Sequence, residues 1–139
     1  MFKMRHAKKA DKMFWLTLDK HIGKDELLLK IRNKRAYIMF DGNKPIGVMR
    51  YNLFWDEIPF LTFIYIKENY QGHGFGKKAM LLWEREMRKQ EYKMVMTSTQ
   101  VDEQVQHFYR KLGYIDKGSL FFDNTVLEQP QELLMLKEL

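Results

Sequence analysis

The feature that most constrains this chain is a glycine-rich loop placed directly between a strand-like and a helix-like segment. The apolar run 61–66 precedes the loop, residues 70–78 form it, and a helical pattern continues to residue 89. Glycine tolerates positive φ and lets a ligand approach the backbone closely. Consecutive N–H groups at a helix start attract anions, helped by the helix dipole. The segment therefore predicts a phosphate-binding loop.

The spacing of the glycines decides which kind of phosphate loop this is. A Walker A loop needs a glycine at position 71 and Ser or Thr after Gly76-Lys77, and both are missing. The dinucleotide fingerprint G-x-G-x-x-G fails as well, because the spacing here is G-x-G-x-G. The pattern that fits is Gln71-x-x-Gly74-x-Gly76, which resembles the pyrophosphate loop of the GNAT superfamily of N-acetyltransferases, [RQ]-x-x-G-x-[GA]. For these six residues alone, a glycine turn without a ligand is an equal alternative.

A second segment, residues 102–114, strengthens the resemblance. It is similar to the GNAT pattern N-x-x-A-x-x-[FL]-Y-x-K-x-G-[FY], except that Asp102 replaces the Asn and Val105 the Ala. The matching residues are Phe108, Tyr109, Lys111, Gly113 and Tyr114. The two motifs stand in the family's order, with a helix and a strand between them, so the resemblance is strong from residue 61 to residue 114.

Length and composition fit a single domain over residues 1–139 that is large enough for a real core. No apolar run approaches the roughly 20 residues of a membrane-spanning helix, and residues 1–6 lack the apolar stretch of a signal peptide. The chain has no cysteine, which excludes disulfides, thiolate metal sites and a cysteine nucleophile. We expect a cytoplasmic protein without a membrane partner.

The net charge of +6 is concentrated at the N-terminus, where residues 1–35 carry eleven Lys or Arg against four Asp or Glu. Such a segment raises the possibility of a nucleic-acid partner, which would need aromatic residues interleaved with the basic ones on an exposed face. Phe14 and Trp15 fall at core positions instead, so we expect no nucleic acid. The positive field suits an anionic cofactor.

Periodicity and turn residues predict an alternating series of helices and strands. We expect strands at 3–6, 35–40, 46–54, 60–66, 93–98, 114–122 and 133–136, and helices at 11–22, 25–31, 75–89 and 101–112, with Asp11 as the first N-cap, residues 55–59 as a connection and Gly113 as the last helix stop. The order β-α-α-β-β-β-α-β-α-β-β is mixed α/β and is also the GNAT order. The resemblance implies a mostly antiparallel central sheet with flanking helices, the fold of acyl-CoA N-acyltransferases.

The resemblance also implies how acetyl-coenzyme A (acetyl-CoA) is held. The backbone of the strand before the loop pairs with the pantetheine arm, and the N–H of Ile66 faces the thioester oxygen. Gln71 adds a side-chain hydrogen bond to the pyrophosphate, and Lys77 adds charge. The expected cofactor-binding residues are Ile64, Tyr65, Ile66, Gln71, Gly72, His73, Gly74, Phe75, Gly76 and Lys77.

Two residues are candidates for proton transfer. Tyr109 is the expected general acid for the leaving thiolate, with core filling as its alternative. Glu57 is the expected base or ammonium ligand, with Asp56 and water as alternatives, beside the possible pocket walls Phe54 and Trp55. The four histidines show no metal-ligand spacing, and we expect no metal.

The predicted function is transfer of an acetyl group from acetyl-CoA to a primary amine, by direct transfer in a ternary complex. The alternative is a non-catalytic acyl-CoA-binding sensor with the same fold. The acceptor is a small-molecule or peptide amine, and its identity stays open, as does a homodimer.

Overall fold

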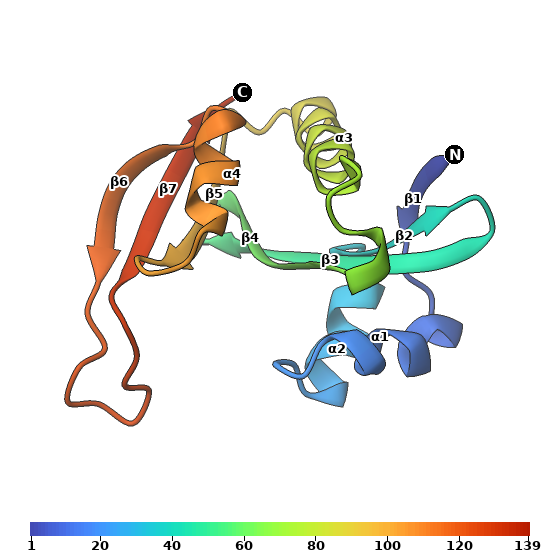
Figure 1. Cartoon of the computed structure of the whole chain (residues 1–139), viewed down its shortest axis with the longest axis horizontal. Helices are drawn as coiled ribbons and strands as arrows, with labels where there is room; N and C mark the ends of the chain where they lie inside the picture. Colours follow the sequence, from blue (N-terminus) through green and yellow to red (C-terminus); the bar gives the residue numbers. More distant parts are fainter. The chain divides into compact units, whose positions relative to one another are not determined.

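The structure, a computed structural model, describes all 139 residues and divides into two compact units. The first unit comprises Met1–Asn52 and Leu61–Arg85, and the second Leu53–Phe60 and Glu86–Leu139. Their segments interleave along the chain, so neither unit is a continuous stretch of sequence. The seven strands form one sheet in the order β1-β2-β3-β4-β5-β7-β6. The mixed α/β class and the predicted element order are confirmed (Figure 1).

The first unit contains all or most of four strands and most of the helices. Its elements are β1 (Phe2–His6), the short 3-10 helix η1 (Lys9–Asp11), α1 (Lys12–Leu18), α2 (Lys24–Arg32), β2 (Ala36–Asp41), β3 (Lys44–Phe54), β4 (Ile58–Ile66), the 3-10 helix η2 (Glu68–Tyr70) and α3 (Phe75–Lys89). The end of β3, the start of β4 and the last turn of α3 belong to the second unit. β1 pairs antiparallel with β2, and β2 with β3 around a turn at Gly42 and Asn43. β1 lies at the edge of the sheet.

The two faces of this sheet are covered by different helices. α1 and α2 lie against one face, where Trp15 and Leu27 pack with Ala36, Ile38 and Val48. α3 lies against the opposite face (Figure 1), where Tyr37 stacks on Tyr51 and Tyr51 contacts Trp83 of α3 at 5.6 Å between ring centroids. Burying each of these large side chains contributes about 1.5–3 kcal/mol. Successive side chains of β2 and β3 point to opposite faces of the sheet, so the same two strands contribute to a hydrophobic core on each face.

The first helix begins where it was predicted but ends earlier. Asp11 occupies the N-cap position of α1 as predicted, although its side chain makes no cap hydrogen bond, because its carboxylate accepts the N–H of Lys8 at 2.7 Å and pairs with Arg5. α1 ends at Leu18, and Ile22 lies in the following connection rather than in the helix. The carboxylate of Asp19 ends the helix by accepting hydrogen bonds from a side chain of the helix and from the backbone beyond it.

The predicted helix 75–89 matches α3 at both bounds, and Gly113 ends α4 (Val105–Lys111) as predicted. Gly113 has a φ of 100°. Its N–H donates to the carbonyl of Arg110, and the N–H of Tyr114 donates to the carbonyl of Tyr109. This is the Schellman arrangement, which needs a left-handed residue after the last helical turn.

The connection between β3 and β4 is shorter than predicted. Ile58 and Pro59 already belong to β4, and only residues 55–57 turn. Trp55 and Asp56 have φ values of 55° and 60°, and the N–H of Glu57 donates to the carbonyl of Phe54 at 3.0 Å. Two successive positive φ values define a type I′ turn, whose twist matches paired strands. Because the turn is this short, β4 begins directly after it, at Ile58.

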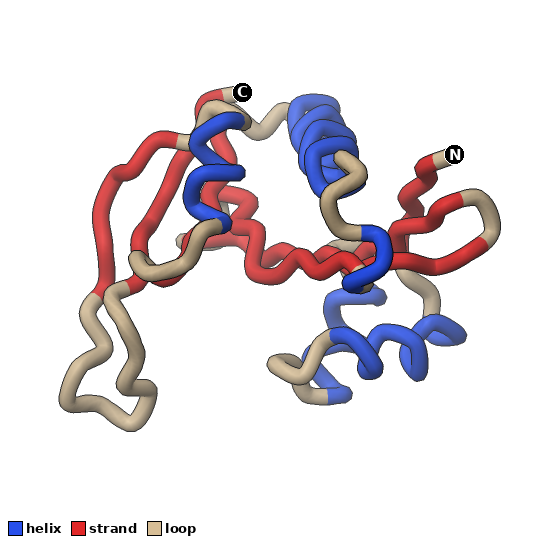
Figure 2. Tube along the Cα trace, viewed as in Figure 1, coloured by secondary structure: helices blue, strands red, loops and turns tan.

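The second unit is a three-stranded antiparallel arrangement with α4. β5 (Met94–Gln100) pairs with β7 (Glu132–Glu138), and β7 pairs with β6 (Ile115–Leu120). β6 is shorter than the predicted 114–122, and β7 is longer than 133–136. The long loop between them, residues 121–131, extends well beyond the strands (Figure 2).

Candidate active site

β4 ends in the three residues expected to pair with the pantetheine arm, and a glycine of β3 lies directly against them. A Cβ added to Gly47 would lie 2.6 Å from the carbonyl oxygen of Tyr65 and 3.3 Å from the Cα of Ile66. The N–H of Lys67 donates to the carbonyl of Ile46 at 2.8 Å, which ties the end of β4 to β3. Only glycine allows this approach without displacing the Tyr65 peptide.

Gln71 holds the end of the same strand. Its Nε2 donates to the carbonyl oxygen of Ile66 at 2.7 Å. One of the two amide N–H bonds is therefore used inside the protein, and the other stays available. The side chain predicted to contact pyrophosphate has a structural task in addition: it couples the strand end to the loop.

The glycine loop presents a run of free donors. Gly72 and Gly74 have φ values of 79° and 81°, and a Cβ at either position would meet no atom within 4 Å. No acceptor of the chain takes the backbone N–H groups of residues 72–77, and the first helical bond runs from Lys78 to the carbonyl of Gly74. Six adjacent free N–H groups and open space beside them are what an anion needs at a helix start.

An aromatic cluster beneath the loop keeps it in place. The ring of Phe75 stacks on Phe2 of β1 at 5.7 Å and contacts Tyr70 at 6.4 Å and His73 at 6.1 Å. Phe75 thus packs against the protein, and its contribution to a ligand is its backbone. His73 is exposed, so its ring lies outside the core, as predicted.

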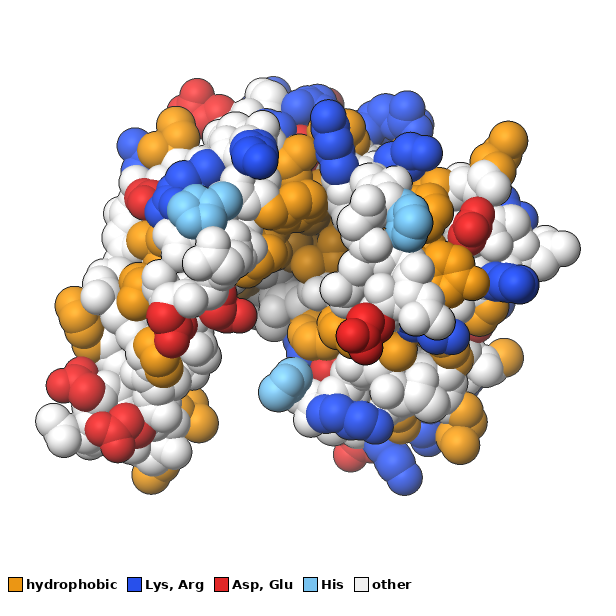
Figure 3. All heavy atoms as spheres, in the orientation of Figure 1, with side chains coloured by type: hydrophobic (Ala, Val, Ile, Leu, Met, Phe, Trp, Pro, Cys, Tyr) orange, Lys and Arg blue, Asp and Glu red, His pale blue; other side chains and the backbone are white.

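The helix after the loop is rich in basic side chains. Lys77 and Lys78 are both exposed, and Lys78 lies over the Phe75 ring at 6.0 Å. Lys and Arg side chains gather over α3 in the space-filling view (Figure 3). Lys77 has no partner in the protein and remains the cation expected to assist a bound phosphate.

Tyr109 lies in the core of the second unit. Its side chain is 4 % exposed, and its ring contacts Phe108 and Tyr114 edge-on. Burial raises the pKa of Tyr109 to about 12, with a hydrogen bond from Thr97 opposing and the charge of Glu103 adding to the shift. The phenol is therefore a firm hydrogen-bond donor at neutral pH. Its catalytic role stays a prediction, and core filling describes its surroundings equally well.

Asp102, which replaces the family's Asn, does not cap α4. Gln104 occupies the N-cap position without a side-chain bond to the helix. Glu103 instead closes the preceding turn, because its Oε1 accepts the N–H of Gln100 at 2.9 Å and the hydroxyl of Thr99 at 3.2 Å. The exposed carboxylate of Asp102 is left free of this turn.

The candidate base Glu57 ends the strained turn before β4. Glu57, Asp56 and Trp55 are all exposed, and the ring of Trp55 contacts that of Phe54 at a tilt, with 4.7 Å between centroids. Glu57 directly precedes β4. Its role as base or ammonium ligand stays a prediction.

Comparison with known families identifies the chain. The model of the acetyltransferase (GNAT) family matches residues 4–114, four fifths of the sequence. The chain belongs to the GNAT family of acetyltransferases. A comparison with curated protein sequences gives no match.

Solved structures show the same GNAT fold. Ard1 from Thermoplasma volcanium has a TM-score of 0.85 at 13 % identity, covering 99 % of this chain and 97 % of that one. Arabidopsis thaliana Naa50, in complex with the bisubstrate analogue CoA-Ac-MVNAL, has a TM-score of 0.82 at 12 % identity, covering 99 % of each chain. The ribosomal-protein-S18-alanine N-acetyltransferase from Escherichia coli has a TM-score of 0.78 at 13 % identity, covering 99 % and 94 %.

Two absences accompany the GNAT fold. None of the helices has the length and apolar character that a bilayer crossing requires. No group of three or more His, Asp or Glu side chains is placed to hold a metal ion.

Sequence reasoning missed a buried ion pair in the first unit of this GNAT protein. Asp19 follows α1 and Arg50 lies on β3, and the Nε of Arg50 donates to Oδ2 of Asp19 at 2.8 Å. The indole of Trp15 and the N–H of His21 also donate to this carboxylate, both at 3.0 Å. Burial would raise the pKa of Asp19, but the hydrogen bonds from these three residues, with the Arg50 charge, lower it overall. The partners lie 31 residues apart, so no local pattern signals them.

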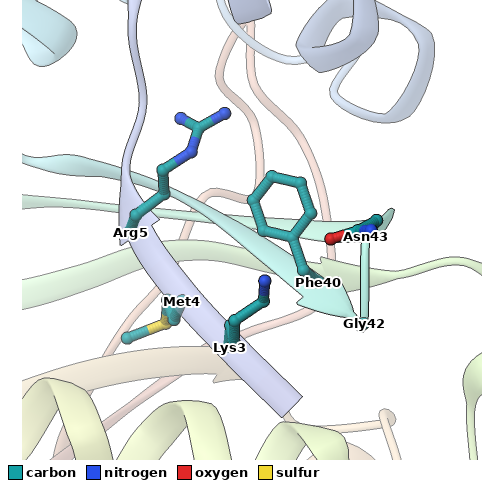
Figure 4. A pocket seen from close by; sticks show the side chains of 6 residues that line it. All are labelled: Lys3, Met4, Arg5, Phe40, Gly42 and Asn43. Atoms are coloured by element: carbon teal, nitrogen blue, oxygen red, sulfur yellow. The ribbon is translucent and has the colours of Figure 1, made fainter. Parts of the chain in front are cut away.

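A second arginine pair lies at the edge of the same sheet, beside a hollow of about 500 Å³ lined by Lys3, Arg5, Phe40 and Asn43 among others. Figure 4 shows the side chains of Arg5 and Lys3 on either side of the Phe40 ring. The guanidinium of Arg5 lies 5.0 Å from the ring centroid and bonds both carboxylate oxygens of Asp11, at 2.7 and 3.1 Å. Both amino groups of the Arg5 guanidinium are thus already paired with a carboxylate of the protein.

Proposed function

We propose that this GNAT protein transfers the acetyl group of acetyl-CoA to a primary amine, directly and within a ternary complex. The observation that carries the proposal is the set of six free N–H groups at residues 72–77, at the start of α3, in a chain of the acetyltransferase family. The Naa50 structure with a bisubstrate analogue supports it, because that protein shares the fold over 99 % of each chain.

The pyrophosphate of acetyl-CoA would be held by the backbone of Gly72, His73, Gly74, Phe75, Gly76 and Lys77. The second amide N–H of Gln71 and the ammonium of Lys77 would add one neutral and one charged donor. The backbone of Ile64, Tyr65 and Ile66 would pair with the pantetheine arm as an added strand. The contact between Gly47 and Tyr65 supports this role, since it holds the peptide planes of that strand end in one orientation.

The chemistry then needs an attacking amine, a polarised carbonyl and a protonated leaving group. The neutral amine attacks the thioester carbon, and the N–H of Ile66 stabilises the oxyanion that develops. The C–S bond breaks, the new amide forms, and the amine gives up one proton. Tyr109 hydrogen-bonds the thiolate, or donates its proton to it and regains one from the water that took the amine proton, and coenzyme A leaves as the thiol.

For the amine proton, we assign water as the immediate acceptor and Glu57 as an electrostatic aid. The exposed carboxylates of Asp56 and Glu57 attract a cationic acceptor before it loses its proton.

The test is release of free coenzyme A from acetyl-CoA in the presence of amino acids, peptides, polyamines and aminoglycosides. We expect turnover that depends on both substrates and yields the acetylated amine by mass spectrometry. Tight binding of acetyl-CoA without turnover of any amine would favour the second candidate, a non-catalytic acyl-CoA sensor. The full burial of Tyr109 is the observation that favours it.

A further inference from the structure

The side chain of Arg50 is mostly buried, and its guanidinium is only partly paired within the protein. Its side chain is 8 % exposed and that of Asp19 is fully buried. Asp19 takes the Nε edge alone, and no other group of the protein accepts a hydrogen bond from Arg50. An arginine offers five N–H donors, so the four on Nη1 and Nη2 are left over. These amino groups are not among the buried polar atoms that lack a partner, so they reach the surface and are open to a ligand.

Asp19 does not pair with these amino groups. Its two oxygens accept three hydrogen bonds, from Trp15, His21 and the Nε of Arg50. The ring of Phe63 on β4 lies under the guanidinium, 5.1 Å from its centre, and His21 contacts the same ring at 6.1 Å. The carboxylate of Asp19 and the ring of Phe63 together fix the plane of the guanidinium. The edge that carries Nη1 and Nη2 is left without a partner in the protein.

The surroundings of this edge are positively charged. Lys30 is half-buried, and its Nζ donates to the carbonyl of Tyr51, next to Arg50 in the chain. Burial, followed by the charges of Arg50 and Arg35, lowers the pKa of Lys30, and the charge of Glu26 opposes the shift. The charges of Arg50 and Lys30 thus repel each other. An anion at the free edge of Arg50 would reduce that repulsion.

The position of Phe63 relates the edge to the chemistry. Phe63 precedes Ile66 by three residues on β4, which corresponds to roughly 10 Å. A group bound at Arg50 can therefore belong to the same small molecule as the amine that attacks near Ile66.

We propose that Arg50 binds a carboxylate of the acceptor, so that the substrate is an amine carrying a carboxylate within about 10 Å of its nitrogen: an amino acid or a short acidic peptide. The proposal rests on the proposed acetyl transfer for the identity of the ligand. Two parallel N–H bonds from one arginine to one carboxylate are the strongest geometry available. Asp19, Trp15 and Phe63 act as positioning residues for that arginine.

The first experiment uses the unmodified protein and acceptors that differ only in the carboxylate. Amino acids are compared with their amides, and peptides with an acidic second residue are compared with the corresponding carboxamides. We expect kcat/KM to favour the acids by at least about tenfold, the effect of losing charge-assisted hydrogen bonds. The two series distinguish a free amino acid from a peptide. Equal kcat/KM for acid and amide in both series would overturn the proposal and leave acetyl transfer intact.

The second experiment replaces Arg50 by lysine, which keeps the charge beside Asp19 but lacks the planar fork. The acceptor KM should rise at least about tenfold for acids and stay level for amides, with the KM for acetyl-CoA unchanged. Arg5→Lys is the matched control, because Arg5 also pairs with an aspartate and lies over a phenylalanine, but its fork is filled by Asp11. Equal losses for acids and amides in Arg50→Lys would reduce Arg50 to a structural role.

A binding measurement separates this proposal from the transfer itself. N-acetylated amino acids retain the carboxylate and should raise the melting temperature of the protein in the presence of coenzyme A, whereas their amides should not. The shift should vanish in Arg50→Lys and persist in Arg5→Lys. A carboxylate-dependent shift without turnover would uphold the anion site and refute the transferase. Absence of any shift, or a shift kept in Arg50→Lys, would refute the anion site. If Arg50→Lys does not fold, the acid and amide comparisons on the unmodified protein decide alone.

Discussion

Replacing Gly74 by valine should weaken acetyl-CoA binding by a factor of roughly 10² to 10⁴. Gly74 has a φ of 81°, which a β-branched residue adopts only under strain. Relaxing φ rotates the peptide groups on either side and turns two of the six free N–H groups away from a bound phosphate. Each such bond to a charged group is worth about 1.5–3 kcal/mol, so two give about 3–6 kcal/mol, which converts to that range. Calorimetric titration with acetyl-CoA measures it.

The control is Gly42→Val. Gly42 also has a positive φ, 62°, and a Cβ there would likewise meet no atom within 4 Å. Both variants should lose about 1–2 kcal/mol of unfolding free energy from backbone strain. Only Gly74→Val should lose affinity. Unchanged affinity in Gly74→Val, or an equal loss in both variants, would refute the assignment of the loop.

Four further predictions concern Tyr109, Glu57 and Gly47. Tyr109→Phe should bind acetyl-CoA normally but turn over on the order of tenfold more slowly or worse. Full activity of this variant would mean that Tyr109 only fills the core. Because the pKa of Tyr109 is raised to about 12, the folded protein keeps a proton that the unfolded chain releases near pH 10. The wild type should therefore lose about 2–3 kcal/mol more stability than Tyr109→Phe as the pH rises from 10 to 12, measured by denaturant unfolding, and parallel pH profiles would contradict the shift. Glu57→Gln should raise the acceptor KM, more at low salt, without changing kcat or the KM for acetyl-CoA in steady-state kinetics. A large loss in kcat would make Glu57 the base, and no effect would leave the amine to water alone or to Asp56. Gly47→Ala should displace the Tyr65 peptide, lower unfolding free energy by about 1–3 kcal/mol, and raise the KM for acetyl-CoA more than that of the acceptor; an unaltered melting temperature would mean the strand yields freely.

Much of the fold was predictable because the deciding signals are local. The helix 75–89 was predicted at both bounds, since its apolar positions recur with helical spacing directly after the glycine loop. Gly113 was predicted as a helix stop because a left-handed residue there is a requirement of the local backbone. Tight turns were harder: nothing in Trp55-Asp56 predicts two positive φ values, which asparagine and glycine usually supply.

The candidate site likewise has features that the sequence predicts and features that only the tertiary structure shows. By itself, the sequence predicted a phosphate-binding loop and indicated the family, because glycine spacing and free N–H groups at a helix start are properties of a short segment. Only the tertiary structure decided that Gln71 is tied to Ile66, that Gly47 bears on Tyr65, and that Arg50 is held by Asp19 with one edge free. These contacts depend on which strands and helices pack together. Hydrogen bonds between residues 31 apart leave no periodic trace in the sequence, because each partner alone looks like an ordinary charged residue.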